Sequence, residues 1–242
     1  MAKKKKTTRT PKKTAKRKKT KTAKKATKKK AIKKTTTATK KRKTTKKKPY
    51  TVPATGPLKM MVASTVYGFQ TELTQLCAVL TSYGYEVLNS HIRKIRVPHG
   101  KSNNQACLDA VGECHVFLGV IRQHYGSGIT HNEIKEAKKL DRPRWFVAHA
   151  FVPFSQQVFR QYKKSKKQKK TLPVSISYSK TSVMDNLKVI DMYEDAINVE
   201  GANNERKWAQ EFFEFSDLLE FVETNFKDHE WVRSECLKGV SP

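Results

Sequence analysis

Acidic residues are missing from the first 48 positions of this 242-residue sequence, although the whole chain contains 21 Asp and Glu. The same segment has no Phe, Trp or Tyr, since the first aromatic residue is Tyr50. With so few apolar side chains, residues 1–48 cannot bury enough surface to offset the loss of chain entropy on folding. They also lack the apolar face of a membrane anchor and the apolar core of a signal peptide. We therefore expect a disordered tail.

Long apolar runs and paired cysteines are absent as well. No run approaches the roughly 18 apolar residues that cross a bilayer, so no membrane partner is expected. The four cysteines lie in scattered apolar stretches without a Cys-x-x-Cys pair. This pattern predicts reduced thiols in the core of a cytoplasmic protein, and it favours neither a disulfide framework nor a metal site. We expect no metal and no cofactor.

The tail is instead rich in positive charge. The tail holds 26 of the 51 Lys and Arg, so only +4 of the net charge of +30 belongs to the remaining residues. Such a segment binds polyanions through counterion release, and without aromatic residues it reads sequence weakly. The composition resembles the tails of linker-histone-like proteins. DNA or RNA is the predicted partner, which implies association with a nucleoid or nucleus, and a solubilising or targeting extension is the alternative.

The tail residues expected to contact nucleic acid are Lys3, Lys4, Lys5, Lys6, Lys12, Lys13, Lys16, Arg17, Lys18, Lys19, Lys40, Lys41, Arg42 and Lys43.

Composition also sets the domain boundaries. Residues 49–57 contain three prolines and a glycine and are predicted to be a linker. One folded domain is expected over 58–230, with its core at 58–150, followed by a C-terminal extension at 231–242.

Strands and helices alternate in the core. Strands are expected at 58–63, 85–88, 115–121 and 145–148, and helices at 69–82, 103–112 and 129–140. This order predicts an α/β fold with a doubly wound, mostly parallel sheet. Farther on, we expect a helix over 153–170 with Phe154 and Val158 inward, and strands at 174–178 and 187–192.

A glycine turn, Gly126-Ser127-Gly128, follows the central strand and precedes a helix whose first turn is expected to contain Glu133. Ligands of open parallel sheets bind at the carboxyl ends of the strands, which is where this turn lies. Glu133 is therefore the best-placed carboxylate in the chain. The alternative is a carboxylate that only stabilises the helix start. His131 is interpreted as a solvated surface residue, and a polar residue of the pocket is the alternative.

Two basic segments leave alternatives open. His99-Gly100-Lys101-Ser102 ends like a phosphate loop, but Ile95 stands where the first glycine of that motif is required. Lys101 and the amides ahead of the next helix could still hold a phosphate, and a solvated loop is the alternative. The cluster at 163–170 either extends the nucleic-acid surface or is an exposed loop.

Two stretches carry a family resemblance. KMMVASTVYGFQTE (59–72) and ACLDAVGECHVFLGVIRQHYGSGITHNEIKEA (106–137) closely resemble the domain-of-unknown-function 4062 family. That family is similar to Toll/interleukin-receptor (TIR) domains and to nucleoside 2-deoxyribosyltransferases. The resemblance implies a flavodoxin-like, TIR-like sheet. It places Glu133 where the transferases have their nucleophile and where TIR enzymes have the glutamate that cleaves the nicotinamide–ribose bond of NAD.

The resemblance also implies a ribose and phosphate pocket. It is expected to be lined by Ser64, Thr65, Tyr67, Gly126, Ser127 and Gly128. His115 stands where the transferases typically have an aspartate, which favours NAD cleavage over base exchange. The leading hypothesis is a hydrolase of the N-glycosidic bond in NAD or a related nucleotide, tethered to nucleic acid and acting in stress or antiviral signalling. A nucleic-acid-associated adaptor that forms homo-oligomers, or a nucleoside-processing enzyme, is the alternative.

The tail hypothesis predicts a steep salt dependence of nucleic-acid binding. Retention of the full chain on duplex DNA should fall by orders of magnitude between about 50 and 200 mM salt, because each neutralised phosphate releases counterions. Deleting residues 1–48 should remove most of the slope of log affinity against log salt, as measured by fluorescence anisotropy. An unchanged slope after the deletion would assign binding to the folded domain.

Overall fold

The computed structural model of the chain describes residues 50–167, 184–198 and 209–238. For residues 160–167 it describes the helical backbone alone. The tail with all of its predicted nucleic-acid contacts, and the strand expected at 174–178, lie outside the described residues. Among the helices of the described ranges, none is long and apolar enough to cross a membrane.

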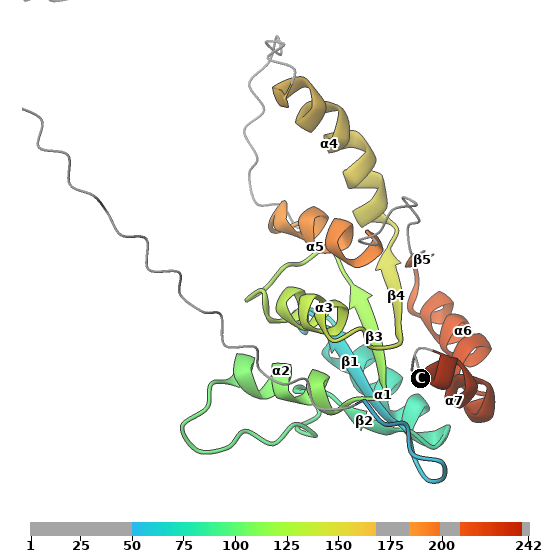
Figure 1. Cartoon of the computed structure of the whole chain (residues 1–242). Coiled ribbons are helices and arrows are strands. Elements are labelled where there is room, and N and C mark those ends of the chain that lie inside the picture. Colours follow the sequence, from blue (N-terminus) through green and yellow to red (C-terminus); the bar gives the residue numbers. More distant parts are fainter. Residues whose placement is uncertain (1–49, 168–183, 199–208, 239–242) are drawn as a thin grey trace, which may run out of the picture. The chain divides into compact units, whose positions relative to one another are not determined.

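Five parallel strands form one sheet in the order β2-β1-β3-β4-β5 (Figure 1). The strands are β1 (Lys59–Ser64), β2 (Glu86–Leu88), β3 (Val116–Ile121), β4 (Arg144–His149) and β5 (Ala209–Phe212). This order is that of flavodoxin-like doubly wound sheets, so the predicted fold class is confirmed. β5, a short edge strand, was not among the expected elements.

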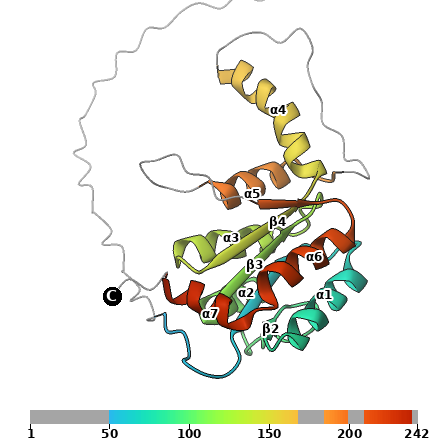
Figure 2. The same ribbon diagram turned by 90° about the vertical axis from the view of Figure 1, so that its right-hand side faces the viewer.

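Helices cover both faces of the sheet (Figure 2). They are α1 (Gln70–Ser82), α2 (Asn103–Glu113), α3 (Ile129–Lys139), α4 (Phe151–Lys167), α5 (Lys188–Ile197), α6 (Phe215–Phe226) and α7 (His229–Lys238). One core cluster joins the sheet to α1, α6 and α7, and the other joins it to α2, α3 and α5. All four cysteines are buried and unbridged.

The central strand β3 shows why the sequence folds in this way. Val116, Leu118 and Val120 belong to one core cluster, whereas Phe117 and Ile121 belong to the other. Every residue of β3 is buried. A continuous apolar run is required at this position, because side chains alternate between two covered faces of a parallel sheet.

Two expectations for the second half of the chain are wrong. The segment expected as a strand at 187–192 belongs to helix α5, whose apolar residues recur at helical spacing as far as Ile197. In α4, Val152 and Gln156 face inward, whereas Phe154 is 64% exposed and Val158 is also exposed. Helix α4 therefore packs on the domain through the face of Val152 and Gln156, and the face of Phe154 and Val158, which was expected inward, is exposed.

The expected linker is attached to the domain from Tyr50 onward. The Tyr50 hydroxyl donates a 2.8 Å hydrogen bond to the His115 carbonyl, and the Arg142 guanidinium lies 4.6 Å from the centre of the Tyr50 ring. Arg233 donates to the carbonyls of Pro53 and Gly56. The chain thus enters the domain at the amino ends of the strands.

The segment expected as a C-terminal extension also packs with the domain. Helix α7 buries Val232 and Cys236 completely in the core cluster shared with α1 and α6. The packed domain therefore continues to Lys238.

Gly119 in β3 and Gly112 in α2 offer matched tests of this packing. A Cβ at Gly119 would lie 2.7 Å from Phe146 Cδ1, whereas a Cβ at Gly112 would have no neighbour within 4 Å. Gly119→Ala should lower the free energy of unfolding by about 1–3 kcal/mol through overpacking. Gly112→Ala should raise it by about 0.5–1 kcal/mol because alanine favours the helix. Urea unfolding of both variants checks the signs, and equal effects would contradict the packing.

Candidate functional site

The candidate site lies at the carboxyl ends of β1 and β3, where the strand order reverses. The chain leaves β1 toward β2 on one side, and it leaves β3 toward β4 on the other. The helices that follow these strands lie on opposite faces, α1 with one core cluster and α3 with the other. In open α/β sheets a crevice for ligands forms at this position.

The loop after β1 contacts the loop after β3. Arg122 donates a 2.9 Å hydrogen bond from Nη1 to the Tyr67 carbonyl, and the Tyr67 and His124 rings meet edge to face with centroids 5.6 Å apart. A Cβ at Gly126 would lie 3.0 Å from Thr65 Cγ2, and Gly126 has a φ of +59°. Glycine is required here both for the conformation and for the close approach. Of the predicted residues, the structure thus brings Thr65 against Gly126, and Tyr67 contacts the second loop through Arg122 and His124.

Thr65 has a buried hydroxyl without a partner. Its side chain is 7% exposed, and Oγ1 has no hydrogen-bond partner among the described residues. Buried hydroxyls are nearly always hydrogen-bonded, so an unpartnered one in the loop after β1 is a candidate contact for a ligand. The neighbouring Ser64 is also buried, and its hydroxyl lies 3.4 Å from the Thr65 carbonyl.

Glu133 is buried between α3 and α2. It is 3% exposed and makes no ion pair within the described part of the chain. Burial raises the pKa of Glu133 to about 7, although a hydrogen bond from the Cys107 thiol opposes the shift. Burial, reinforced by the charge of Glu133, raises the pKa of Cys107 to about 12, so this thiol remains a donor.

This geometry corrects the predicted placement of Glu133. Helix α3 begins at Ile129 and has no acidic residue in its first turn, so Glu133 starts the second turn. The alternative of a carboxylate that only stabilises the helix start does not describe it, because the helix dipole acts mainly within the first turn. A nearly dry carboxyl without a cationic partner is costly and is typical of catalytic acids and bases.

His131 is not the solvated surface residue that was expected. It is 5% exposed, with Nδ1 2.9 Å from the Tyr125 hydroxyl and Nε2 2.8 Å from Asp195 Oδ2. Burial raises the pKa of Asp195, but His131 and Lys135 outweigh it and bring the pKa below its usual value. These hydrogen-bonded side chains connect the glycine turn to α5.

Asp185 is a second contact that sequence reasoning missed. Its Oδ1 accepts a 2.8 Å hydrogen bond from the Tyr125 amide, and its Oδ2 lies 3.5 Å from the Gly126 amide. It comes from the segment just before α5, almost 60 residues after the turn. No local pattern could have paired them.

The remaining predicted site residues are placed as follows. Ser127 is exposed at the tip of the turn, and Gly128 is the N-cap of α3 with a φ of +80°. Lys101 lies with Nζ 2.6 Å from Asp109 Oδ2, and its contacts in the described ranges do not join it to the glycine turn. Its predicted role in phosphate binding remains a prediction.

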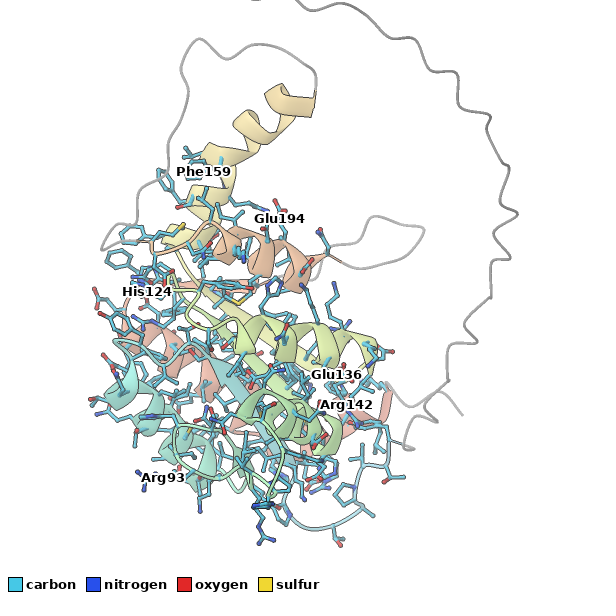
Figure 3. All side chains as sticks on the ribbon, turned by 90° about the vertical axis from the view of Figure 1, so that its left-hand side faces the viewer. Arg93, His124, Glu136, Arg142, Phe159 and Glu194 are labelled. Carbon is cyan, nitrogen blue, oxygen red and sulfur yellow. The ribbon has the colours of Figure 1, made fainter. Side chains whose placement is uncertain are left out.

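A cavity of about 210 Å³ lies at the opposite end of the strands, where their amino ends lie. It is lined by Tyr50, Thr51, Lys59, Gly112, Glu113, Cys114, His115 and Arg142. His124 follows the carboxyl end of β3 and Arg142 precedes the amino end of β4, so the two residues mark opposite ends of the strands (Figure 3). The cavity therefore does not contain Glu133, and a ligand that reaches Glu133 must displace the side chains that bury it. Within the described residues, no three His, Cys, Asp or Glu are grouped to hold a metal ion.

Comparison with known proteins adds a family match. Residues 59–225 match the model of a family described as Domain of unknown function (DUF4062). No curated protein matches the chain. One similar solved structure is that of the activated Roq1 resistosome, which is described as directly recognizing the pathogen effector XopQ. Its TIR domains are 15% identical to this chain with a TM-score of 0.36, over 46% of this chain and 71% of theirs. A conserved protein from Enterococcus faecalis V583 is 13% identical with a TM-score of 0.38, over 70% of this chain and 99% of its own.

Burial of Glu133 predicts a stability that falls as the pH rises. The folded protein keeps the proton to about pH 7, whereas the unfolded chain releases it near 4.5. The stabilising contribution is therefore complete below pH 4.5 and is lost as the pH rises through 7. Glu133→Gln, which mimics the protonated acid, should gain about 3 kcal/mol in unfolding free energy over the parent between pH 4.5 and 8.

Urea unfolding at stepped pH values measures this difference. Glu136→Gln on the same helix is the control, because it removes an ion pair with Lys139 rather than a buried carboxyl (Figure 3). A pH-independent difference between the parent and Glu133→Gln would show that Glu133 is solvated.

Proposed function

This chain belongs to the DUF4062 family, and from its site we propose that it hydrolyses the N-glycosidic bond of a nucleotide, with NAD or a related nucleotide as substrate and Glu133 as the catalytic carboxylate. One observation carries the proposal: Glu133 is a buried carboxyl without a cationic partner in the described residues, and its pKa is about 7. It lies on the helix that begins at the glycine turn, next to the carboxyl ends of β1 and β3.

The chemistry requires one well-placed carboxylate. As the bond between the ribose anomeric carbon and the base nitrogen breaks, its electron pair leaves with the base and the ribose becomes oxocarbenium-like. Ionised Glu133 stabilises this cation, and water then adds to the anomeric carbon and gives its proton to the carboxylate. Nicotinamide leaves as a neutral group, so no strong acid is needed to protonate it.

A pKa near 7 suits this cycle. At neutral pH a substantial fraction of Glu133 is ionised and available to the cation, and the same group can hold the proton that water releases. Exclusion of water strengthens the attraction between carboxylate and cation.

The two loops would supply the rest of the pocket. Thr65 offers its unpartnered hydroxyl to ribose or phosphate, and the Gly126 turn lets the backbone come close. Tyr67 is 72% exposed at the same edge, so its ring is available to lie against a base.

The basic tail would tether this activity to DNA or RNA. The linker is held at Tyr50 on the His115 carbonyl, at the start of β3, whereas the glycine turn follows the end of β3.

A self-associating adaptor without catalysis is the second candidate function. It is favoured by exposed apolar side chains next to one another at the junction of β4, α4 and β5, namely Phe151, Phe154, Val158 and Phe213. Exposed apolar clusters of this kind commonly mark protein interfaces.

Turnover of NAD by the full chain separates the two candidates. The parent should release nicotinamide, measured by chromatography at high protein concentration, and Glu133→Gln should lower the rate by about 10²-fold or more. Glu136→Gln, three residues along α3, should keep the parental rate. Equal rates in the parent and Glu133→Gln would remove Glu133 from catalysis. No turnover with NAD or related dinucleotides, together with concentration-dependent oligomers, would favour the adaptor.

A further inference from the structure

The cavity at the amino ends of the strands has no part in the proposed hydrolysis. The linker, the start of β1, the junction of α2 with β3 and the turn between α3 and β4 all line it. Its volume of about 210 Å³ is below the roughly 300–1,000 Å³ of pockets that enclose drug-sized ligands. A water molecule takes up about 30 Å³ in the liquid, so the cavity has room for a small ion with several waters.

Arg142 is a buried cation of this cavity. It is 5% exposed, its Nη2 donates to the Gly112 carbonyl, and its guanidinium lies over the Tyr50 ring. In the described ranges it forms no ion pair with a carboxylate, and its Nε has no hydrogen-bond partner. A buried cation without a counter-ion is costly, so an anion beside Arg142 would stabilise the folded domain.

His115 adds a neutral hydrogen-bond donor. Its Nδ1 accepts a 2.9 Å hydrogen bond from the Lys59 amide, so the neutral ring carries its proton on Nε2. Burial lowers the pKa of His115, and the charges of Lys59 and Arg142 lower it further. Nε2 makes no hydrogen bond within the part of the chain that the structure describes, and it can therefore donate to a ligand.

The charges around the cavity favour an anion. The Lys59 ammonium is partly exposed and lies 3.8 Å from Glu86 Oε1, which is a loose ion pair. Glu113, the acidic residue among the lining side chains, is exposed at the end of α2. With His115 neutral, the lining keeps an excess of one positive charge. The Gly112 carbonyl, near the negative end of the α2 dipole, is bound by Arg142 and repels an anion less.

We propose that this cavity is a binding site for a small oxyanion, either phosphate or a carboxylate, held by the Arg142 guanidinium, the Lys59 ammonium and Nε2–H of His115. A guanidinium and an oxyanion match in geometry, and charge-assisted hydrogen bonds are the strong ones. The bound anion joins the linker at Tyr50 to the junctions that precede β3 and β4. The inference is independent of the proposed hydrolysis, because Glu133 does not line the cavity.

Titration of the full ¹⁵N-labelled chain with inorganic phosphate, at constant ionic strength, tests the site. The backbone amide signals of Thr51 and His115 should shift saturably. A separate titration with acetate distinguishes the two ligands: tighter binding of phosphate assigns a phosphoryl group, and tighter binding of acetate assigns a carboxylate. The local readout separates this site from phosphate bound by lysines of the tail.

Lys59→Gln removes one charge from the cavity and should weaken the preferred anion roughly fivefold. Lys227→Gln is the matched control, because Lys227 pairs with Glu223 on α6 outside the cavity, and it should bind the anion as the parent does. Arg142→Lys keeps the charge but loses the planar fork, so binding should weaken about tenfold. Since Arg142 also contacts Gly112 and Tyr50, Lys59→Gln decides the question if Arg142→Lys does not fold.

Two results would overturn the proposal. One is the absence of a saturable shift at Thr51 and His115 with either anion, which would leave Arg142 the structural role of holding α2 and Tyr50. The other is equal affinity of Lys59→Gln and Lys227→Gln for phosphate and for acetate, which would place the bound anion elsewhere.

Discussion

Parallel pairing of β1 with β3 is the constraint on which the candidate site depends. The register runs from Met60 opposite Val116 to Ser64 opposite Val120, so both strands end at the same level. The chain then leaves them for opposite faces of the sheet, and Thr65 and the Gly126 turn remain side by side at the opening. Antiparallel pairing would have separated these loops by the length of a strand.

The sequence was most informative where local patterns and burial agree. The apolar run of β3 and the helical spacing of α1, with Leu73, Leu76, Cys77 and Leu80 buried, predicted both elements nearly to their ends. The interpretation failed for α5 because a window ending at Met192 shows no helical period, whereas Tyr193, Ala196 and Ile197 complete it. It failed for α4 because an amphipathic pattern does not reveal which face meets the domain.

The site was predictable only in part, for a related reason. The glycine turn and Glu133 could be found because neighbouring residues define them. Burial of Glu133 against Cys107, and the contacts of Asp185 and Asp195 with the turn and with His131, join residues far apart in the chain. Such contacts are set by the packing of α2 and α5 on α3, and neither periodicity nor spacing reports them.

The hydrogen bonds that Arg233 donates to the carbonyls of Pro53 and Gly56 link the last helix of the domain to its first segment. During synthesis the residues before Pro53 emerge long before Arg233 does. The attachment of Pro53 and Gly56 to the domain therefore waits for the last helix, since a domain is complete only when its last elements arrive. The segment that leads into β1 is thus fixed at the end of synthesis and not at its beginning.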